Sequence, residues 1–313
     1  MSAVWAGSGA SRSTACSRCT APQPSSRGGA AATRGPRYAD PLMAQVDRDL
    51  VFAADDGVEL ALDVYRAPRD DAPVTVYVHG GGWRAGDKAD DGPRRLAPLS
   101  AYGVTVVSVN YRLAPAATFP SQLHDVKAAV RWLRANGTRL GLPTERLGIW
   151  GASAGAYLGS LLALTAGVDQ FEGTVGGNRD QSSAVQAVVH WFGQSDLVAS
   201  AARTAVEARL LPFAFEAGLL GVADVADAVD RARELSLLSW VTSGAPPFLI
   251  AHGDRDHVIL PSEGEALHRA LVRAGADSRF ELLGGTGHEG AGFDSPASLA
   301  MTAAWLRTAL TSP

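Results

Sequence analysis

The stretch LGIWGASAGAYLG at residues 147–159 joins an apolar run to an Ala/Leu-rich run through the pentapeptide G-A-S-A-G. The apolar run at 146–151 predicts a buried strand and the run at 154–167 predicts a helix, so the pentapeptide forms the turn between them. Such a turn holds Ser153 in a strained backbone conformation, which small neighbours tolerate, and sets its hydroxyl at a helix N-terminus. We interpret the pentapeptide as a nucleophile elbow, because an ordinary helix cap at Ser153 would not explain small residues on both sides.

Strands and helices alternate on both sides of this elbow. Short, β-branched apolar runs predict buried strands, and an Asp-Asp-Gly turn predicts an early hairpin. The expected strands lie at 50–53, 59–65, 74–80, 104–110, 146–151, 184–193, 247–253 and 278–285. The expected helices lie at 120–137, 154–167, 261–275 and 295–310. This alternation predicts an α/β fold, in which a mostly parallel sheet carries helices on both faces.

Two segments differ from this pattern. Residues 197–240 are Ala/Leu-rich, and we expect them to form a small helical cap over the strand ends within a single domain at 43–313. Residues 1–42 begin with a stretch of 39 residues that contains five arginines and no acidic residue. Such a segment cannot bury enough apolar surface to fold, so we expect a disordered or non-native tail. An organelle transit peptide and a true start at Met43 are the alternatives.

The acid of a catalytic group built on the serine is expected after the strand at 247–253. A serine hydroxyl is a weak nucleophile until a base takes its proton, and an acid orients that base. On folds with this elbow the acid and then the histidine follow the serine, each after a late strand. Asp254 and Asp256 both follow the strand. We predict Asp256, which lies further into the loop, and keep Asp254 as the alternative, which we assign to shaping the turn.

His288 is the predicted base. It follows the last expected strand in the glycine-rich loop LLGGTGHEG, from which it can turn back toward the serine. His257, beside Asp256, is the rival, although it comes too early in the expected order. Loop or core roles suffice for the other histidines, which are His79, His124, His190, His252 and His268.

A second glycine-rich stretch, VTVYVHGGGW at 74–83, ends the third expected strand. Each glycine costs roughly 0.5–1 kcal/mol relative to alanine inside a regular element, so the loop must require a bare backbone. Attack on a carbonyl creates an oxyanion, which backbone N–H groups of such a loop and of the residue after the nucleophile can stabilise. We predict Gly81, Gly82 and Ala154 as these donors. A phosphate-binding loop is the weaker interpretation, because the spacing G-x-x-x-x-G-K-[ST] is absent from the sequence.

Composition argues against several kinds of partner. The chain has 313 residues, 46% of them hydrophobic and 19% charged, and a formal net charge of −4. This balance argues against nucleic-acid and anionic-membrane surfaces, and no apolar stretch reaches the ~20 residues that span a bilayer. Cys16 and Cys19 have no second Cys/His pair beside them, so we interpret them as an incidental pair in the tail. The predicted chemistry of Ser153 and His288 implies no metal and no organic cofactor. We expect a cytoplasmic protein.

A series of motifs runs through the chain: HGGGW with GDK, NYRLAP, FPSQLHDVKAAVRWLRANG, GIWGASAG, VQAVVHWFG, HGDRDHVI and GTGHEG. Together they resemble the α/β-hydrolase carboxylesterases, most closely the bacterial branch related to hormone-sensitive lipase and to feruloyl and acetyl esterases. The resemblance extends from about residue 50 to the C-terminus and is weakest at 197–235. It implies Ser153 as nucleophile, Asp256 as acid and His288 as base, with the same oxyanion amides.

The sequence departs from these relatives next to the site. Ala156 and Tyr157 follow the nucleophile where relatives usually have glycine and histidine. In the segment HWFGQSD at 190–196, Gln194 stands where proline is more usual. None of these departures touches the predicted catalytic residues, but they bear on which acyl and alcohol groups the site accepts.

The residues and the resemblance together predict a serine carboxylesterase that cleaves short- to medium-chain, aryl or acetyl esters through an acyl-enzyme. An amidase or arylformamidase with the same triad is the first alternative, and a non-catalytic binding protein with a hydrolase fold is the second. The expected partner is a small-molecule ester in a mainly apolar pocket. The predicted pocket residues are Trp83, Trp191, Phe213 and Phe215, with core packing as the alternative role for these aromatic residues, above all for Trp191.

Overall fold

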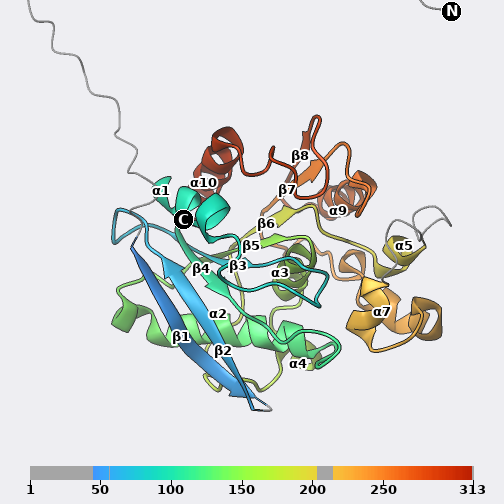
Figure 1. Cartoon of the computed structure of the whole chain (residues 1–313), viewed down its shortest axis with the longest axis horizontal. Coiled ribbons are helices and arrows are strands. Elements are labelled where there is room, and N and C mark those ends of the chain that lie inside the picture. Colours follow the sequence, from blue (N-terminus) through green and yellow to red (C-terminus); the bar gives the residue numbers. More distant parts are fainter. Residues whose placement is uncertain (1–44, 56, 203–213, 312–313) are drawn as a thin grey trace, which may run out of the picture. The chain divides into compact units, whose positions relative to one another are not determined.

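A single twisted sheet organises the chain (Figure 1). The computed structural model describes residues 45–55, 57–202 and 214–311, all of which belong to one compact unit. The predictions for the tail, for the two cysteines and for Phe213 concern residues outside these ranges. The domain boundary at Met43 stays a prediction.

The described residues form eight strands in the order β1-β2-β4-β3-β5-β6-β7-β8. Their bounds are β1 Val46–Asp55, β2 Val58–Tyr65, β3 Val74–Val78, β4 Thr105–Val109, β5 Leu147–Ala152, β6 Ala187–Trp191, β7 Phe248–Gly253 and β8 Ser278–Leu283. β2 pairs antiparallel with β1 and with β4, whereas the remaining neighbours pair in parallel. The predicted α/β fold with a mostly parallel sheet is confirmed.

The central strands are buried along their whole length. Every residue of β3, β4 and β5 is buried. A sheet covered on both faces has no side on which polar residues can meet water, so its strands do not alternate apolar and polar residues. This explains the continuous apolar runs that mark these strands in the sequence.

Helices cover the two faces of the sheet and form two core clusters. Val76 and Tyr77 are adjacent on β3 and belong to different clusters, because successive strand residues point to opposite faces. The first cluster contains residues of α2 Ser121–Leu140, α3 Ala154–Leu164 and α9 Pro261–Ala274. The second contains residues of α1 Ala97–Ala101 and α10 Pro296–Thr311. A π-helical turn, Gly92–Leu96, precedes α1, and α4 Asp169–Glu172 follows α3.

The segment at 197–240 is helical where the structure describes it. Its elements are α5 Leu197–Ala201, α7 Phe215–Leu220, a 3-10 turn Val225–Ala228, α8 Val229–Glu234 and a second 3-10 turn Leu237–Ser239. Asp196 begins α5 by accepting hydrogen bonds from the backbone N–H groups of Val198 and Ala199. In Figure 1, α5 and α7 lie at the right of the molecule, below α9. The role of this segment as a cap stays a prediction.

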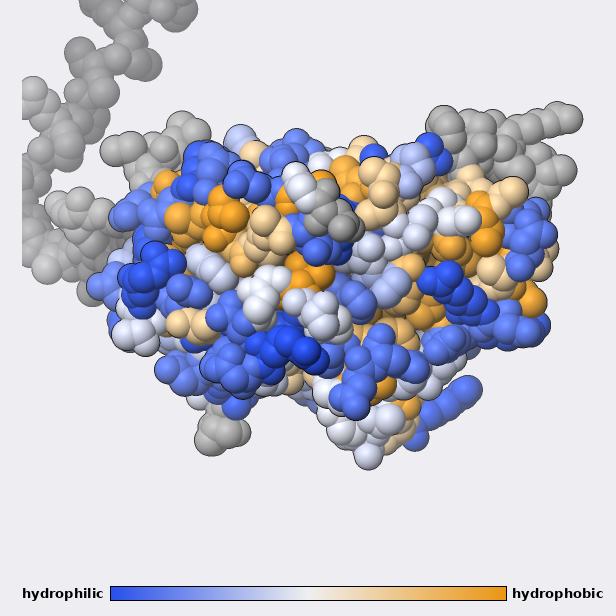
Figure 2. Space-filling model, turned by 90° about the horizontal axis from the view of Figure 1, so that it is seen from below, coloured by the Kyte–Doolittle hydropathy of each residue, from blue (hydrophilic) through white to orange (hydrophobic). Residues whose placement is uncertain are grey.

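The surface mixes polar and apolar residues. Figure 2 shows apolar side chains interspersed with polar ones over one face of the molecule. Within the described ranges, the large apolar side chains that are exposed are Val51, Val58, Leu260, Val272 and Leu282. Among the helices of the described residues, none is long and apolar enough to cross a membrane.

Candidate active site

The pentapeptide at 151–155 forms a sharp turn between β5 and α3. Ser153 has φ 53° and ψ −120°, a strained combination for a residue with a side chain, and it is only 8% exposed. A Cβ at Gly151 would come within 2.2 Å of the Gly155 carbonyl oxygen, and a Cβ at Gly155 within 2.0 Å of the Val78 carbonyl oxygen. Both glycines are therefore required by close backbone packing, which accounts for the G-x-S-x-G pattern.

Backbone hydrogen bonds hold the elbow in place. The Ser153 N–H donates to the carbonyl oxygen of Trp191 at the end of β6, at 2.9 Å. The Ser153 carbonyl oxygen accepts from the N–H groups of Ala156 and Tyr157 in the first turn of α3. The strained residue is thus fixed on one side by the neighbouring strand and on the other by its own helix.

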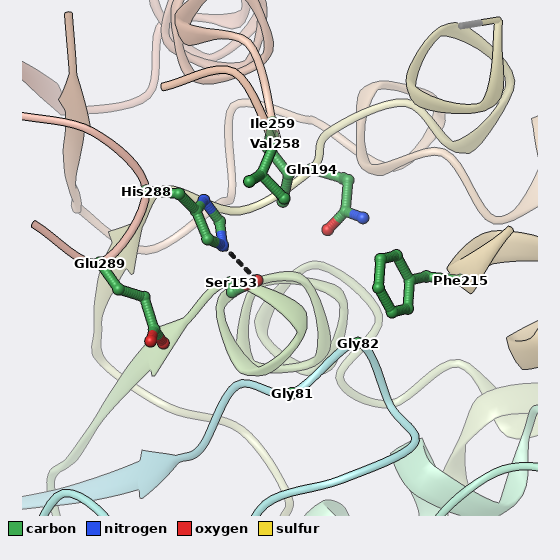
Figure 3. Close-up of a pocket in the computed structure, with 9 residues that line it drawn as sticks. All are labelled: Gly81, Gly82, Ser153, Gln194, Phe215, Val258, Ile259, His288 and Glu289. Carbon is green, nitrogen blue, oxygen red and sulfur yellow. Dashed lines mark hydrogen bonds between the residues drawn. The ribbon is translucent and has the colours of Figure 1, made fainter. Parts of the chain in front are cut away.

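His288 lies between the serine and the aspartate, and Figure 3 shows its contact with Ser153. Its Nε2 is 3.0 Å from Ser153 Oγ, and its Nδ1 is 2.8 Å from Asp256 Oδ2. A carboxylate only accepts hydrogen bonds, so Nδ1 carries the proton and Nε2 is left to accept from the serine hydroxyl. The structure brings together the three residues predicted from the sequence, at hydrogen-bond distances and in the required order.

Asp256 is buried, with 1% of its surface exposed, and its oxygens are fully hydrogen-bonded. Oδ1 accepts from the N–H groups of Val258 and Ile259, at 2.9 and 3.0 Å. Burial would raise the pKa of this carboxyl group, but hydrogen bonds from His252 and His288 outweigh it and hold the pKa well below its usual range. Asp256 is therefore ionised near neutral pH and can orient His288.

His252 is a further contact of this carboxylate, which we did not predict from the sequence. Its Nε2 is 2.9 Å from the Ile259 carbonyl oxygen and 3.3 Å from Asp256 Oδ2. Both partners are acceptors, so Nε2 is the protonated nitrogen and bridges the two ends of the acid loop. The sequence analysis gave His252 only a loop or core role.

The rival residues lie outside this arrangement. Asp254 is exposed, and its Oδ1 accepts from the Thr286 N–H at 3.2 Å, as expected of a residue that shapes a turn. His257 is exposed and follows the buried acid on the solvent side of the loop. Neither contacts Ser153 in the hydrogen bonds of the described residues.

The glycine loop after β3 approaches the serine closely. Gly81 and Gly82 have φ of 107° and 60°, in the region that favours glycine. A Cβ at Gly81 would lie 2.1 Å from the Ala85 carbonyl oxygen, and one at Gly82 would lie 2.3 Å from the Phe215 ring. Among the hydrogen bonds of the described residues outside helices and strands, none uses the N–H of Gly81, Gly82 or Ala154 as donor. These amides are therefore available to an oxygen atom in the site.

Two aromatic side chains lock this loop. Trp83 donates from Nε1 to the Ala154 carbonyl oxygen at 3.2 Å, which ties the loop to the first turn of α3. Tyr111 donates its hydroxyl to the His79 carbonyl oxygen at 3.0 Å, and its ring stacks on His79 with centroids 4.4 Å apart. His79 itself is buried and contacts the Gly80 carbonyl oxygen through Nδ1 at 2.8 Å. It lies in the loop as a structural residue, as the sequence suggested.

A cavity of about 300 Å³ opens at Ser153 (Figure 3). Its lining residues are Gly81, Gly82, Ser153, Gln194, Phe215, Val258, Ile259, His288 and Glu289. Of the four predicted pocket residues, Phe215 lines the cavity and Phe213 lies outside the described residues. Trp83 and Trp191 have no exposed surface, so the prediction that they line the pocket is wrong. Trp83 faces the loop and helix that it joins, and Trp191 packs in the second core cluster.

Four lining residues were missed by the sequence analysis: Gln194, Val258, Ile259 and Glu289. Each lies just after the end of β6, β7 or β8, at the same edge of the sheet as the elbow. The signal available in the sequence was this shared edge, because the carboxyl ends of parallel strands converge on one crevice. Among the described residues, no group of three His, Cys, Asp or Glu side chains could hold a metal ion.

Sequence comparison relates the chain to esterases. The BD-FAE family model matches residues 62–271. The chain is 35% identical over 260 residues to esterase LipC of Mycobacterium tuberculosis, covering 80% of this chain and 60% of LipC. It is 31% identical over 253 residues to ethyl acetate hydrolase of Pseudomonas putida, covering 77% and 74%. It spans between half and three fifths of the length of LipC and of the related M. tuberculosis esterases LipQ and LipM.

Structure comparison also finds esterases that superpose on this chain. A truncated carbohydrate esterase from gut microbiota superposes with a TM-score of 0.78 at 26% identity, over 89% of this chain and all of that one. An esterase of Pyrobaculum calidifontis superposes with a TM-score of 0.67 at 23% identity, over 86% and 87%, and supports the fold alone. These findings confirm the predicted resemblance in sequence and in fold.

Proposed function

Because the chain belongs to the BD-FAE family of α/β hydrolases, we propose that it is a serine carboxylesterase acting on short-chain esters. The observation that carries the proposal is the alignment of Ser153 Oγ, His288 and Asp256 at 3.0 and 2.8 Å beside a cavity. The esterase names of the relatives support the same activity.

Acylation begins with the serine hydroxyl. Ser153 Oγ attacks the ester carbonyl carbon while His288 Nε2 takes its proton. The tetrahedral intermediate then collapses: the bond to the alcohol oxygen breaks, and His288 gives its proton to that oxygen. The products of this half-reaction are the free alcohol and an acyl group bonded to Ser153.

Deacylation repeats these steps with water. His288 Nε2 takes a proton from a water molecule as the water oxygen attacks the acyl carbon. The second intermediate collapses with transfer of the proton to Ser153 Oγ, which restores the serine and releases the carboxylic acid. Asp256 accepts from Nδ1 throughout, so it keeps the imidazole in its working tautomer and stabilises its charged form.

The backbone amides of Gly81, Gly82 and Ala154 are the proposed donors to the oxyanion. In the described part of the chain, no hydrogen bond outside helices and strands uses these N–H groups. Gly81 and Gly82 line the cavity, and Ala154 follows Ser153 directly. Donors fixed before the reaction cost no reorganisation when charge develops, so each contributes to lowering the barrier. The hydrogen bond from Trp83 to Ala154 holds the glycine loop, with Gly81 and Gly82, beside the first turn of α3.

The cavity supports a small acyl group. A volume of about 300 Å³ is at the low end for ligand pockets, and Phe215, Val258 and Ile259 give it apolar walls. The name ethyl acetate hydrolase of one relative agrees with esters of short acids. Two finer predictions from the sequence, a cytoplasmic location and the absence of a nucleic-acid partner, stay predictions.

The test is active-site labelling with a fluorophosphonate, followed by peptide mapping. We expect one label, on Ser153, and loss of hydrolysis in proportion to labelling. A label on another residue, or an active protein without label, contradicts the mechanism. Matched aryl-ester and anilide substrates then separate esterase from amidase: a clear preference for the anilide contradicts the proposed function, and no hydrolysis of either substrate favours the binding-protein alternative.

A further inference from the structure

Gln194 presents a buried acceptor to the cavity. The residue is 4% exposed and lines the cavity beside Ser153, and its Oε1 has no hydrogen-bond partner among the described residues. In Figure 3 the oxygen lies on the side of the amide that faces Ser153. A buried carbonyl without a partner has lost its hydrogen bonds to water and gained none in return. Such an atom favours any ligand that donates a hydrogen bond to it.

Glu216 fixes which end of the amide faces the cavity. The Nε2 of Gln194 is 3.3 Å from Oε1 of Glu216, which is fully buried on α7. A carboxylate oxygen accepts, so the amide nitrogen of Gln194 must face Glu216 and the amide oxygen must face the other way. The orientation of the amide thus follows from its partner, and the acceptor in the cavity is the carbonyl oxygen.

The backbone around Gln194 is held from both sides. The N–H groups of Ser195 and Asp196 both donate to the Glu263 carboxylate at 2.9 Å. On the other side, the N–H of Phe192 donates to the Ala251 carbonyl oxygen at 2.8 Å. The acceptor is therefore placed before any substrate enters, which is the condition for strong discrimination between substrates.

Gln194 lies on the side of the serine away from the catalytic histidine. Figure 3 shows Gln194 and Phe215 on one side of Ser153, and His288 and Glu289 on the other. The leaving alcohol oxygen must come within hydrogen-bond reach of His288 to receive its proton. The alcohol therefore takes the side of His288, and the acyl chain takes the side of Gln194.

Glu289, the second polar side chain of the cavity, has partners of its own. Glu289 is 38% exposed on its side chain and lies 3.7 Å from Arg94, so solvent and a cation satisfy its carboxylate. Beside Gln194 lies the apolar ring of Phe215, and Val258 and Ile259, also apolar, lie between Gln194 and His288. Gln194 Oε1 is thus the polar atom there that needs a donor from the substrate.

We propose that Gln194 selects esters whose acyl group carries a hydrogen-bond donor, a hydroxyl or an N–H, close to the carbonyl carbon. This inference rests on the proposed esterase function and narrows its substrate class. A plain acyl chain of the same length leaves the acceptor unpaired inside an apolar wall, and a site built to bind a hydroxyl discriminates strongly against the analogue that lacks it. Short hydroxy acids and N-acylated amino acids meet this requirement.

The experiment compares aryl esters with one leaving group and four acyl groups: butyryl, 2-hydroxybutyryl, 3-hydroxybutyryl and N-acetylglycyl. For each, kcat/KM is divided by the value for butyryl, in the parent and in Gln194→Met, which keeps the side-chain length and removes the acceptor. We expect this ratio to fall about tenfold or more in the variant for at least one donor-bearing ester. Intrinsic differences in ester reactivity cancel, and so does any difference in the folded fraction of a preparation.

A matched control is Gln181→Met, at a partly exposed glutamine that contacts Asp180. We expect its ratios to equal those of the parent. Ratios that differ less than twofold between the parent and Gln194→Met for every donor-bearing ester overturn the inference, even where all esters slow down together. If the parent hydrolyses butyryl ester through Ser153 in that case, the proposed function stands; if it hydrolyses none of the four esters, the proposed function fails as well.

Discussion

Two serines of helix α3 and its preceding turn each contact a histidine, and only one of the two contacts lies in a reactive setting. Ser160 Oγ is 2.8 Å from His190 Nδ1, whereas Ser153 Oγ is 3.0 Å from His288 Nε2. The shorter contact is completely buried, because neither Ser160 nor His190 has exposed surface. The distance between a serine and a histidine is therefore not what separates a nucleophile from a core residue.

The surroundings make the difference. His288 has Asp256 on its far nitrogen, whereas Nε2 of His190 has no hydrogen-bond partner among the described residues. Ser153 is strained and borders a cavity, whereas Ser160 lies inside the regular helix α3. Burial lowers the pKa of His190 to about 4, so it is neutral at pH 7 and a poor base. An orienting acid, backbone strain and access to a substrate distinguish Ser153 and His288 from Ser160 and His190.

Replacement of the two serines gives the largest expected contrast. Ser153→Ala should lower kcat for an aryl ester by about 10⁶-fold, because the nucleophile itself is lost. Ser160→Ala should retain activity close to the parent and lose stability only, because it removes one buried hydrogen bond. Steady-state hydrolysis and thermal unfolding of both variants measure this. Parent-like turnover in Ser153→Ala would refute the assignment of the nucleophile.

Removal of the orienting acid tests the next difference. Asp256→Asn should lower kcat by about 10⁴-fold, because the amide no longer holds His288 in the tautomer that accepts the serine proton. The control is Asp254→Asn, where the side-chain oxygen can still accept from the Thr286 N–H and activity should change little. A larger loss in Asp254→Asn than in Asp256→Asn would reassign the acid.

The glycine loop tests whether backbone donors set the reactive pair apart. Gly82→Ala should lower kcat by about 10²–10³-fold, because the new Cβ meets the Phe215 ring at 2.3 Å and displaces the amide that we propose as an oxyanion donor. Gly141→Ala is the matched control: its φ is 64°, and a Cβ there meets nothing within 4 Å. It should cost about 1–2 kcal/mol of stability and leave kcat intact. Equal kcat in the two variants would contradict the role of this loop.

The smallest effect concerns His190 and is a change in stability with pH. Its pKa is about 4 in the folded protein and near 6.5 when unfolded, so the unfolded chain takes up the proton first as the pH falls. Stability present above pH 6.5 is therefore lost between pH 6.5 and 4, by about 3 kcal/mol at most. The free energy of unfolding is measured with denaturant at pH 7 and at pH 4.5. Its decrease between these two pH values should be smaller in His190→Gln than in the parent. The exposed His257→Gln should match the parent, and an unchanged dependence in His190→Gln would show that His190 is not held neutral by burial.

The fold and the three residues that meet at the site could be predicted because their signals are local in the sequence. Gly151 and Gly155 leave no room for a Cβ, so the pentapeptide around Ser153 is imposed by backbone packing and is readable as a pattern. Asp256 and His288 follow β7 and β8, and parallel strands bring such positions to one edge. These requirements act on single positions or on chain order, which a sequence displays directly.

The pocket could not be predicted with the same success, because tertiary packing decides it. Trp191 ends β6 beside His190, and strand alternation sends its ring to the opposite face, where it packs on Trp150 with centroids 4.8 Å apart. Gln194 reaches the cavity because Glu263 of α9 holds the loop after it, a contact 68 residues distant in the chain. No sequence pattern near residue 194 predicts the contact with Glu263.

The hydrogen bond from Trp83 to Ala154 has a consequence for redesign of the enzyme. It links the glycine loop to the first turn of α3, so the proposed oxyanion donors in the two segments are held next to each other. The cavity residues Gln194, Val258 and Ile259 lie in other loops, and Phe215 begins α7. Libraries that vary these four positions can therefore test new acyl groups without changing Ser153, His288, Asp256 or the glycine loop.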